Sequence, residues 1–177
     1  TFVQDPTVPS QYRYHITSVW LRSQHPEGPN IAGPVLQKMA FNPEDPNYQS
    51  ALVHLRDFGR TTDRKALRTL ARNPLQDPHY ECFLARCLFN SQSSQNNKEL
   101  GHIMLWKIVQ TPQHRKFSGA VCGLVESGSE DDRNRLQQNA LILDAQSCYM
   151  IARSFGGGSI SNGKEIQRAL LMHIVET

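Results

Sequence analysis

Three residues near the C-terminal end have the spacing of a nucleotide-binding loop. Gly158, Gly163 and Lys164 fit the Gly-x-x-x-x-Gly-Lys pattern whose backbone cradles phosphates. The pattern requires a Ser or Thr next, and Glu165 follows instead. It also requires a preceding strand, whereas residues 151–155 have helical character. We interpret the glycines as the end of one helix and the start of another, and a nucleotide hydrolase remains only the last of three hypotheses.

The cysteines and histidines form no recognisable metal site. Cys82 and Cys87 are five residues apart, which directs them to different sides of a helix, and no Cys-x-x-Cys occurs. Cys122 with His114 stays open as a nucleophile pair, but no motif supports it. Four scattered cysteines are typical of a reducing, intracellular compartment. The sequence predicts a soluble binding protein without catalytic site, metal or cofactor.

The strongest chemical signal is a series of basic residues along one predicted helix. These residues are Arg60, Arg64, Lys65, Arg68 and Arg72. Guanidinium groups four residues apart lie about 6 Å apart along a helix, and Asp63 is the one acid nearby. Such spacing suits the phosphates of a nucleic acid, and the lack of aromatic residues for base stacking favours a duplex over a single strand. A purely structural basic face is an equally open alternative.

Further basic residues occur in the second half of the chain. The additional candidates for nucleic-acid contacts are Lys98, Arg115, Lys116, Arg133 and Arg135. Duplex RNA hides its bases in a deep major groove, so binding through these residues would depend on shape and backbone rather than sequence. The net charge of +3 neither requires nor excludes a nucleic-acid partner.

Helices must position all of these residues, because apolar side chains recur at helical spacing from Tyr48 to Ile174 and no segment alternates with period two. The sequence therefore predicts an all-α fold, with one long helix from Leu136 to Ile151. Capping residues mark the expected helix starts. These are Asp45-Pro46, Asp77-Pro78, Thr111-Pro112, Ser129 and Asn162.

The distribution of proline and polar residues suggests four parts. Residues 1–44 are predicted to be an extended N-terminal arm with at most one short helix, residues 34–39. Residues 45–90 form helical subdomain I, 91–97 a flexible hinge and 98–177 helical subdomain II. No internal repeat of 20–50 residues is recognised. The polar start without an initiator Met suggests a product cut from a longer chain.

The order of these elements resembles the inner scaffold and ribonucleoprotein-forming protein of birnaviruses, the third viral protein of their polyprotein. The similarity covers about residues 11–177 and is patchy. It rests on Asp45-Pro46-Asn47-Tyr48-Gln49-Ser50-Ala51-Leu52, Phe58-Gly59, Thr62-Asp63, Asp77-Pro78-His79, Phe83-Leu84-Ala85, Arg135-Leu136 through Ile142, Ala145 and Tyr149, the break at Gly156–Gly158, and the last helix from Ile166.

This resemblance implies two helical subdomains, a homodimer and sequence-independent binding of double-stranded RNA, in the virion and the host cell cytoplasm. It implies a capsid scaffold that engages the capsid precursor and the viral polymerase, and a suppressor of RNA silencing. Some relatives also bind phosphoinositide membrane surfaces. The chain departs from the family where a basic cluster is reduced to Lys98, and it lacks the charged C-terminal tail. The alternative is a helical protein–protein adaptor or effector that binds no nucleic acid.

Overall fold

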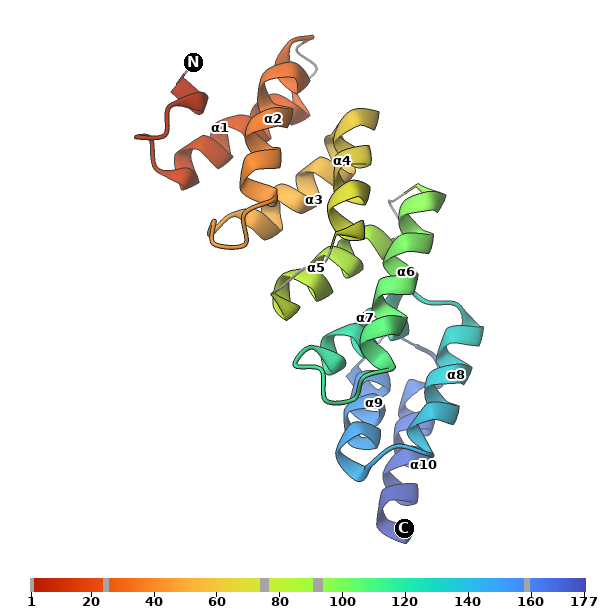
Figure 1. The fold of residues 1–177 in the computed structure, drawn as a ribbon. Helices are drawn as coiled ribbons and strands as arrows, with labels where there is room; N and C mark the ends of the chain where they lie inside the picture. The colour runs from red at the N-terminus through yellow and green to blue at the C-terminus, as the bar shows by residue number, and fades with distance from the viewer. Residues whose placement is uncertain (1, 24–25, 74–76, 91–93, 158–159) are drawn as a thin grey trace.

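The computed structural model describes residues 2–23, 26–73, 77–90, 94–157 and 160–177, and throughout these ranges the fold is all-α, as predicted. Ten α-helices follow a short 3-10 helix, and no strand occurs in the described ranges (Figure 1). The elements are η1 (Phe2–Gln4), α1 (Ser10–Arg22), α2 (Gly28–Ala40), α3 (Tyr48–Phe58), α4 (Thr61–Arg72), α5 (Pro78–Phe89), α6 (Gln95–Val109), α7 (Phe117–Ser127), α8 (Glu130–Ala140), α9 (Ala145–Gly157) and α10 (Gly163–Glu176).

The helices form an elongated two-layer stack that runs from the N-terminus to the C-terminus (Figure 1). Consecutive helices pack on each other, and the odd-numbered helices α1, α3, α5, α7 and α9 also pack on one another in sequence. The even-numbered helices make the second layer, with α2 beside α4, α4 beside α6, and α8 beside α10. Because the main contacts join helices one or two positions apart, the molecule has the quasi-one-dimensional architecture of helical-repeat proteins.

A recurring side-chain link joins α2 to α4, α4 to α6, and α6 to α8. The third residues of α4, α6 and α8 are Asp63, Asn97 and Asp132, at intervals of 34 and 35 residues. Each accepts a hydrogen bond from the preceding even-numbered helix. The donor–acceptor distances are 2.6 Å from Gln37 Nε2 to Asp63 Oδ1, 2.9 Å from Arg68 Nη1 to Asn97 Oδ1, and 2.6 Å from His102 Nε2 to Asp132 Oδ1.

The turns before α4 and α8 repeat the same local structure. Gly59 and Gly128 each precede the capping acid by four residues, and a Cβ at either would lie 2.2 Å from the carbonyl oxygen of Leu55 or Leu124. The backbone therefore requires glycine at both turns. The absence of a repeat inferred from sequence is thus wrong at the structural level, since links of one geometry recur with different side chains.

The prediction that residues 1–44 form an extended N-terminal arm is also wrong, because α1 and α2 lie in this range and are packed helices. α2 buries Leu36, Met39 and Ala40, and α1 buries Leu21 together with the polar Thr17. The Thr17 hydroxyl donates to the carbonyl of Arg13 at 2.7 Å, which satisfies it inside the helix. Polar residues buried in this way remove the apolar pattern that sequence reasoning depends on.

Helix starts were predicted with mixed success. Asp77 caps α5 and accepts from the Tyr80 backbone N–H at 2.7 Å, and Ser129 caps α8. α7 begins at Phe117 rather than after Thr111, and α3 begins at Tyr48, three residues after Asp45. Asn162 occupies the position before α10 but makes no side-chain capping bond.

The single long helix expected from residue 136 to 151 is two helices. α8 ends at Ala140, and α9 begins at Ala145. Asp144 starts the new helix, because its carboxylate accepts from the Ser147 backbone N–H at 3.0 Å and from the Ser147 hydroxyl at 2.8 Å.

Only part of the predicted hinge, residues 91–97, can be compared, because residues 91–93 lie outside the described ranges. Gln95 to Asn97 form the first turn of α6, and Asn97 is fully buried. The helices on either side are tightly joined, since a Cβ at Gly101 would lie 2.5 Å from the backbone nitrogen of Phe89. The division into two subdomains stays a prediction.

Candidate functional site

Two of the predicted RNA-binding arginines cap the helix that precedes their own. Arg64 donates from Nε to the Arg56 carbonyl at 3.1 Å and from Nη2 to the Asp57 carbonyl at 3.4 Å, at the end of α3. Arg133 donates from Nη1 to the Gly128 carbonyl at 2.8 Å, after the end of α7. A cation that donates to the last carbonyls of a helix stabilises it, so both side chains have a structural task.

Arg60 and Arg68 are also engaged within the stack. Arg68 makes the link to Asn97 described above, and Arg60 contacts the carboxylate of Asp63 and the side-chain oxygen of Asn30. The predicted basic helix face contains four arginines, whose guanidinium groups were expected to contact phosphates. Three of these guanidinium groups, those of Arg60, Arg64 and Arg68, are instead bonded to other elements of the fold.

Arg135 lies over an aromatic ring rather than in an open basic patch. Its guanidinium carbon is 4.2 Å from the ring centroid of Trp106, a cation–π contact between α8 and α6. The indole N–H of Trp106 in turn donates to Asp132 Oδ1 at 2.9 Å.

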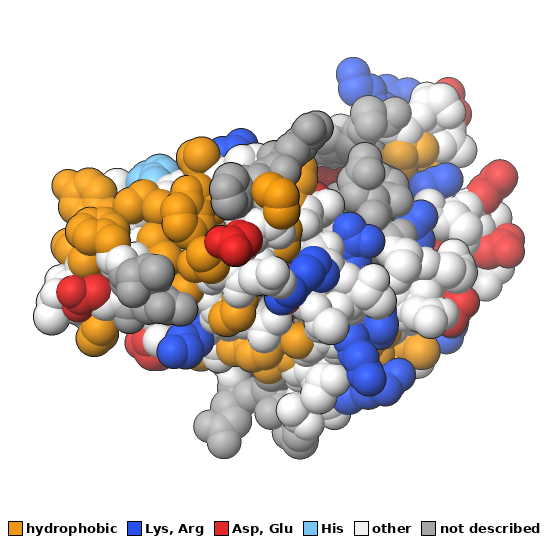
Figure 2. Space-filling view, turned by 90° about the horizontal axis from the view of Figure 1, so that it is seen from above, with side chains coloured by type: hydrophobic (Ala, Val, Ile, Leu, Met, Phe, Trp, Pro, Cys, Tyr) orange, Lys and Arg blue, Asp and Glu red, His pale blue; other side chains and the backbone are white. Residues whose placement is uncertain are grey.

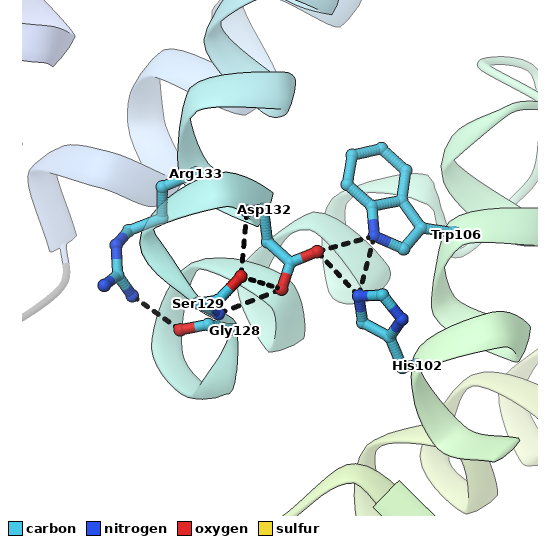
Figure 3. A network of polar contacts seen from close by, with 6 residues as sticks. All are labelled: His102, Trp106, Gly128, Ser129, Asp132 and Arg133. Carbon is cyan, nitrogen blue, oxygen red and sulfur yellow. Dashed lines mark hydrogen bonds and ion pairs between the residues drawn. The ribbon is translucent and has the colours of Figure 1, made fainter. Parts of the chain in front are cut away.

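The polar network around Asp132 joins α6, α8 and the turn before α8 (Figure 3). Oδ1 accepts from His102 and Trp106, while Oδ2 accepts from the Ser129 backbone N–H at 2.9 Å. Burial raises the pKa of Asp132, but the hydrogen bonds from His102, Trp106 and Ser129 outweigh it and lower the pKa to about 2. The carboxylate is therefore charged at neutral pH and organises three elements.

Besides Arg135, whose contact is with the Trp106 ring, five predicted site residues make no side-chain hydrogen bond or ion pair within the described ranges. They are Lys65, Arg72, Lys98, Arg115 and Lys116. Lys65, Arg68 and Arg72 have the i, i+3, i+7 spacing of one side of α4. Arg68 bonds to Asn97 on α6, and Lys98 is the next residue along α6. We term Lys65, Arg68, Arg72 and Lys98 the α4 flank.

Arg115 and Lys116 belong to a different place. They lie in the turn before α7 and line a hollow of about 360 Å³ together with Asp77, Pro78 and His79 at the start of α5. The ten predicted residues therefore do not form one surface.

Two adjoining hollows lie on the layer of odd-numbered helices. These hollows, of about 230 Å³ each, share Val53 and Phe83 as a common wall. The first extends to Tyr14 on α1 and His54 on α3, and the second extends across α5 to Gly123 on α7. We term these two adjoining hollows, lined by residues of α1, α3, α5 and α7, the odd-helix groove.

Aromatic side chains line the N-terminal half of the odd-helix groove and its edge. The Tyr14 hydroxyl lies 3.2 Å from His54 Nδ1, and the two rings meet edge to face at a centroid distance of 5.5 Å. The ring of His54 also lies beside that of Phe58, with a centroid distance of 5.8 Å, and Phe58 is 47% exposed. Half-buried aromatic residues with a polar atom at one end are the side chains that most often anchor protein partners.

The C-terminal half of the groove carries paired charges. Arg86 on α5 donates to Glu126 on α7 at 2.9 Å, and both side chains are more than 40% exposed. Glu126 also accepts from the Cys122 thiol at 3.0 Å. Burial, with the hydrogen bond to Glu126, raises the pKa of Cys122 to about 11, so this thiol is protonated at neutral pH and is bonded to Glu126 rather than to His114.

Sequence reasoning missed both the groove and the repeated links, although signals for each are present. Val53 follows the fully buried Leu52 in the sequence, and Phe83 precedes the fully buried Leu84. Both residues therefore lie at the edge of the buried side of their helix. Two of the three links, those at Asp63 and Asp132, are marked by Gly-x-x-x-Asp-Arg, which occurs at residues 59–64 and again at residues 128–133.

Neither a metal site nor a membrane span is found in the part of the chain that the structure describes. No group of three or more His, Cys, Asp or Glu side chains there could hold a metal ion. None of the described helices is long and apolar enough to cross a membrane. Comparison of the chain with protein-family models, curated proteins and solved structures gave no match.

Proposed function

We propose that this protein is a helical-repeat adaptor that binds a segment of another protein in the odd-helix groove. The observation that carries the proposal is the pair of adjoining hollows, which share Val53 and Phe83 and of which one extends to Tyr14 and His54. Stacked helical hairpins present such extended surfaces to protein partners. The paired Arg86 and Glu126 would fix the direction of a bound segment through its polar groups.

The engagement of the arginines supports an adaptor over a nucleic-acid-binding protein. Arg60, Arg64, Arg68 and Arg133 donate to groups of the fold, so that pulling them onto phosphates would break links or helix caps. The groove needs no such rearrangement.

Selection from a displayed peptide library tests the proposal and needs no assumption about which protein is the partner. We expect wild-type protein to enrich peptides with apolar anchors, and Phe83→Ala to weaken the binding of those peptides by about tenfold or more, because it removes a wall shared by both hollows. Tyr149→Ala is the matched control, since Tyr149 is a half-exposed aromatic residue on α9 outside the groove. Enriched peptides that bind Phe83→Ala and wild-type protein equally well would contradict the proposal.

A second candidate is the double-stranded-RNA-binding viral scaffold implied by the birnavirus resemblance. One observation favours it, namely that the α4 flank gathers Lys65, Arg72 and Lys98 without any neutralising partner in the described ranges. Three lysine or arginine contacts to phosphates would give a slope of log affinity against log salt of about −2.7 for a duplex.

A gel-shift titration with an RNA duplex at two salt concentrations tests this candidate. If the α4 flank binds RNA, Lys65→Ala with Arg72→Ala will reduce the salt dependence, whereas Arg64→Ala will leave it unchanged because that guanidinium caps α3. An absence of binding at physiological salt would reject the RNA-binding candidate and leave the adaptor.

A further inference from the structure

The turns that precede α3 and α7 have the same backbone structure. α3 begins at Tyr48 and α7 begins at Phe117, 69 residues later, and each follows a turn of seven residues. The backbone N–H of Tyr48 donates to the carbonyl oxygen of Asp45 at 3.0 Å. In the same way, the N–H of Phe117 donates to the carbonyl oxygen of His114 at 2.9 Å. The two turns therefore occupy equivalent positions in the repeat.

Side chains tie the first of these turns to the preceding odd-numbered helix. Ser10, the first residue of α1, donates from Oγ to the carboxylate of Asp45, with a distance of 2.8 Å to either oxygen. Asn47 donates from Nδ2 to Ser10 Oγ at 3.0 Å. These bonds join the turn before α3 to the start of α1, and they provide the acidic side chain of the turn with a donor.

The second turn lacks these side chains, and a hollow of about 360 Å³ lies between it and the start of α5. Lys116 stands where the first turn has Asn47, and His114 stands at the position of Asp45. Pro78, the first residue of α5, has no polar side chain that could bond to the turn. The exchange of these residues leaves the space open. We term this space the basic hollow, and its lining consists of Asp77, Pro78, His79, Arg115 and Lys116.

The side chains that line the basic hollow carry a net positive charge. Arg115 is exposed and Lys116 is half-buried, and neither side chain makes a hydrogen bond or ion pair in the described part of the chain. Asp77 is already engaged, because it accepts the backbone N–H of Tyr80 at 2.7 Å and caps α5. Glu81, one turn further along α5, lies within 4.0 Å of two other basic side chains. The hollow therefore offers two unpaired cations against one carboxylate, and its side chains rather than the end of α5 would attract an anion.

Positive charge is not spread evenly over this protein, whose net charge is only +3. On the face shown in Figure 2, Lys and Arg side chains lie in separate small groups among acidic and uncharged side chains, and hydrophobic side chains gather over the N-terminal elements. Salt screens exposed charges from groups farther away than the nearest neighbours. Attraction of an anion to the basic hollow therefore depends on Arg115 and Lys116 themselves.

The basic hollow adjoins the odd-helix groove. His79 lines the hollow, and its Nε2 lies 3.2 Å from Nε2 of Gln49. Gln49 in turn lines the groove together with Tyr14 and Phe83. A single contact between two side chains therefore separates the aromatic end of the groove from the basic hollow, and a bound segment that passes Gln49 reaches the hollow next.

We propose that the basic hollow binds an anionic group, a carboxylate or a phosphate, of the protein segment whose apolar residues occupy the odd-helix groove. The assignment of the anion to such a segment rests on the proposed function, whereas the anion site rests on the side chains of the hollow itself. A guanidinium group such as that of Arg115 donates two parallel N–H groups to a carboxylate or phosphate, and Lys116 adds a second charge beside it. The preferred segment therefore combines apolar anchors with an acidic or phosphorylated residue.

Titration of the protein with inorganic phosphate and with acetate, each against chloride at constant ionic strength, tests the anion site. We expect chemical-shift changes that saturate and that cluster at His79, Arg115 and Lys116. Arg115→Gln with Lys116→Gln should weaken this binding by about tenfold or more, because the charge-assisted hydrogen bonds are lost. Lys65→Gln with Arg72→Gln removes the same charge from exposed positions of α4 and is the matched control, which should titrate as wild type does.

Peptide binding tests whether the partner segment supplies the anion. If acetate binds, peptides selected on wild-type protein should carry Asp or Glu at a fixed spacing from their apolar anchors. If only phosphate binds, synthetic copies of those peptides with phosphoserine at one end should bind about tenfold more tightly than copies with serine. In either case Arg115→Gln with Lys116→Gln should retain the preference for the apolar anchors and lose the preference for the anion.

The outcomes separate this inference from the adaptor function. Shifts that neither anion localises to the basic hollow, or that the double variant reproduces, would overturn the anion site. Apolar peptides that bind wild type and Arg115→Gln with Lys116→Gln equally, with no gain from an acid or phosphoserine, would overturn it as well and leave the adaptor intact. An anion bound in the hollow while no peptide is enriched would refute the adaptor and keep the site. An RNA duplex that shifts Arg115 and Lys116 at physiological salt would overturn the protein segment as the source of the phosphate. Circular dichroism confirms that each variant is folded.

Discussion

Single side chains in this protein act mainly by joining helices, and Asp132 is the clearest example. Its carboxylate accepts hydrogen bonds from α6 through His102 and Trp106 and from its own capping turn through Ser129 (Figure 3). A buried carboxylate with this number of donors contributes to stability only while it is charged and all of its donors are in place.

Replacing Asp132 should therefore be costly. We expect Asp132→Ala to lower the free energy of unfolding by about 2–4 kcal/mol, because it removes a helix cap and leaves buried donors without an acceptor. Asp131→Ala is the matched control in the same helical turn, since Asp131 is exposed and should contribute only the roughly 0.3–1 kcal/mol of a charge at a helix N-terminus. Urea unfolding measures both, and equal effects would show that the network is dispensable.

The same residue predicts a pH dependence. The pKa of Asp132 falls from its ordinary value of 3.8 to about 2 in the folded protein, so the charged form stabilises the fold above pH 4 and this contribution is lost as the pH drops towards 2. The stability difference between wild type and Asp132→Asn should shrink across this interval. Thermal unfolding at a series of pH values measures it, and a constant difference would refute the assigned pKa.

Among the elements, α4, α6 and α8 each accept a link at their third residue, and α6 differs from the other two in the chemistry of that residue. Asp63 and Asp132 are carboxylates, whereas the equivalent Asn97 is an amide whose buried Nδ2 has no hydrogen-bond partner in the described ranges. An orphaned buried donor is destabilising, and a carboxylate there would also face the guanidinium of Arg68 and the N-terminal end of the α6 dipole.

We accordingly expect Asn97→Asp to stabilise the protein by roughly 0.5–1.5 kcal/mol, because it replaces the orphaned donor by an acceptor at the N-terminus of α6. Asn96→Asp is the control, since Asn96 is exposed in the same turn and should give only the helix-dipole effect. Denaturant midpoints of the two variants measure the difference. A less stable Asn97→Asp variant would contradict this expectation, because it would mean that the desolvation free energy of the carboxylate exceeds the stabilisation from its contact with Arg68.

The helix caps made by arginine predict a second contrast within one element. Arg64→Ala should destabilise the protein by about 1–2 kcal/mol, because it leaves the carbonyls of Arg56 and Asp57 without their donor. Arg72→Ala, on the exposed end of the same helix, should change stability by less than about 0.5 kcal/mol. Hydrogen exchange at the end of α3 should quicken only in Arg64→Ala, and unchanged exchange there would disprove the cap.

The helices themselves were largely predictable, because α3 to α7 and α10 carry apolar residues at helical spacing. Most of these residues are buried or half-buried, but Phe58, Ile103 and Ala169 are exposed. α1 was not, since it buries Thr17 and Ser18 behind local hydrogen bonds to the backbone. The repeat escaped detection because its links use three different pairs, namely Gln with Asp, Arg with Asn, and His with Asp. Most of the predicted basic residues lie on helices, but Arg60 precedes α4, and Arg115 and Lys116 lie in the turn before α7. The partners that occupy Arg64, Arg68 and Arg133 come from neighbouring elements that sequence spacing cannot place.

At the scale of the whole molecule, the two layers have different tasks. The even-numbered helices form one layer, in which polar links join α2, α4, α6 and α8, and the odd-numbered helices form the other layer (Figure 1). Val53, His54 and Phe83 line the odd-helix groove on the second layer. Because neighbouring hairpins stabilise one another, a partner bound across several helices would also stabilise the stack as a whole.

The measurement that tests the adaptor function most directly is amide and methyl chemical-shift mapping with a peptide obtained from the selection. We predict that shifts cluster at Tyr14, Val53, His54 and Phe83 on the odd-helix groove and that the α4 flank does not respond. If the peptide instead perturbs residues scattered over the surface, or if an RNA duplex at physiological salt perturbs Lys65, Arg72 and Lys98 while no peptide occupies the groove, the adaptor function is wrong.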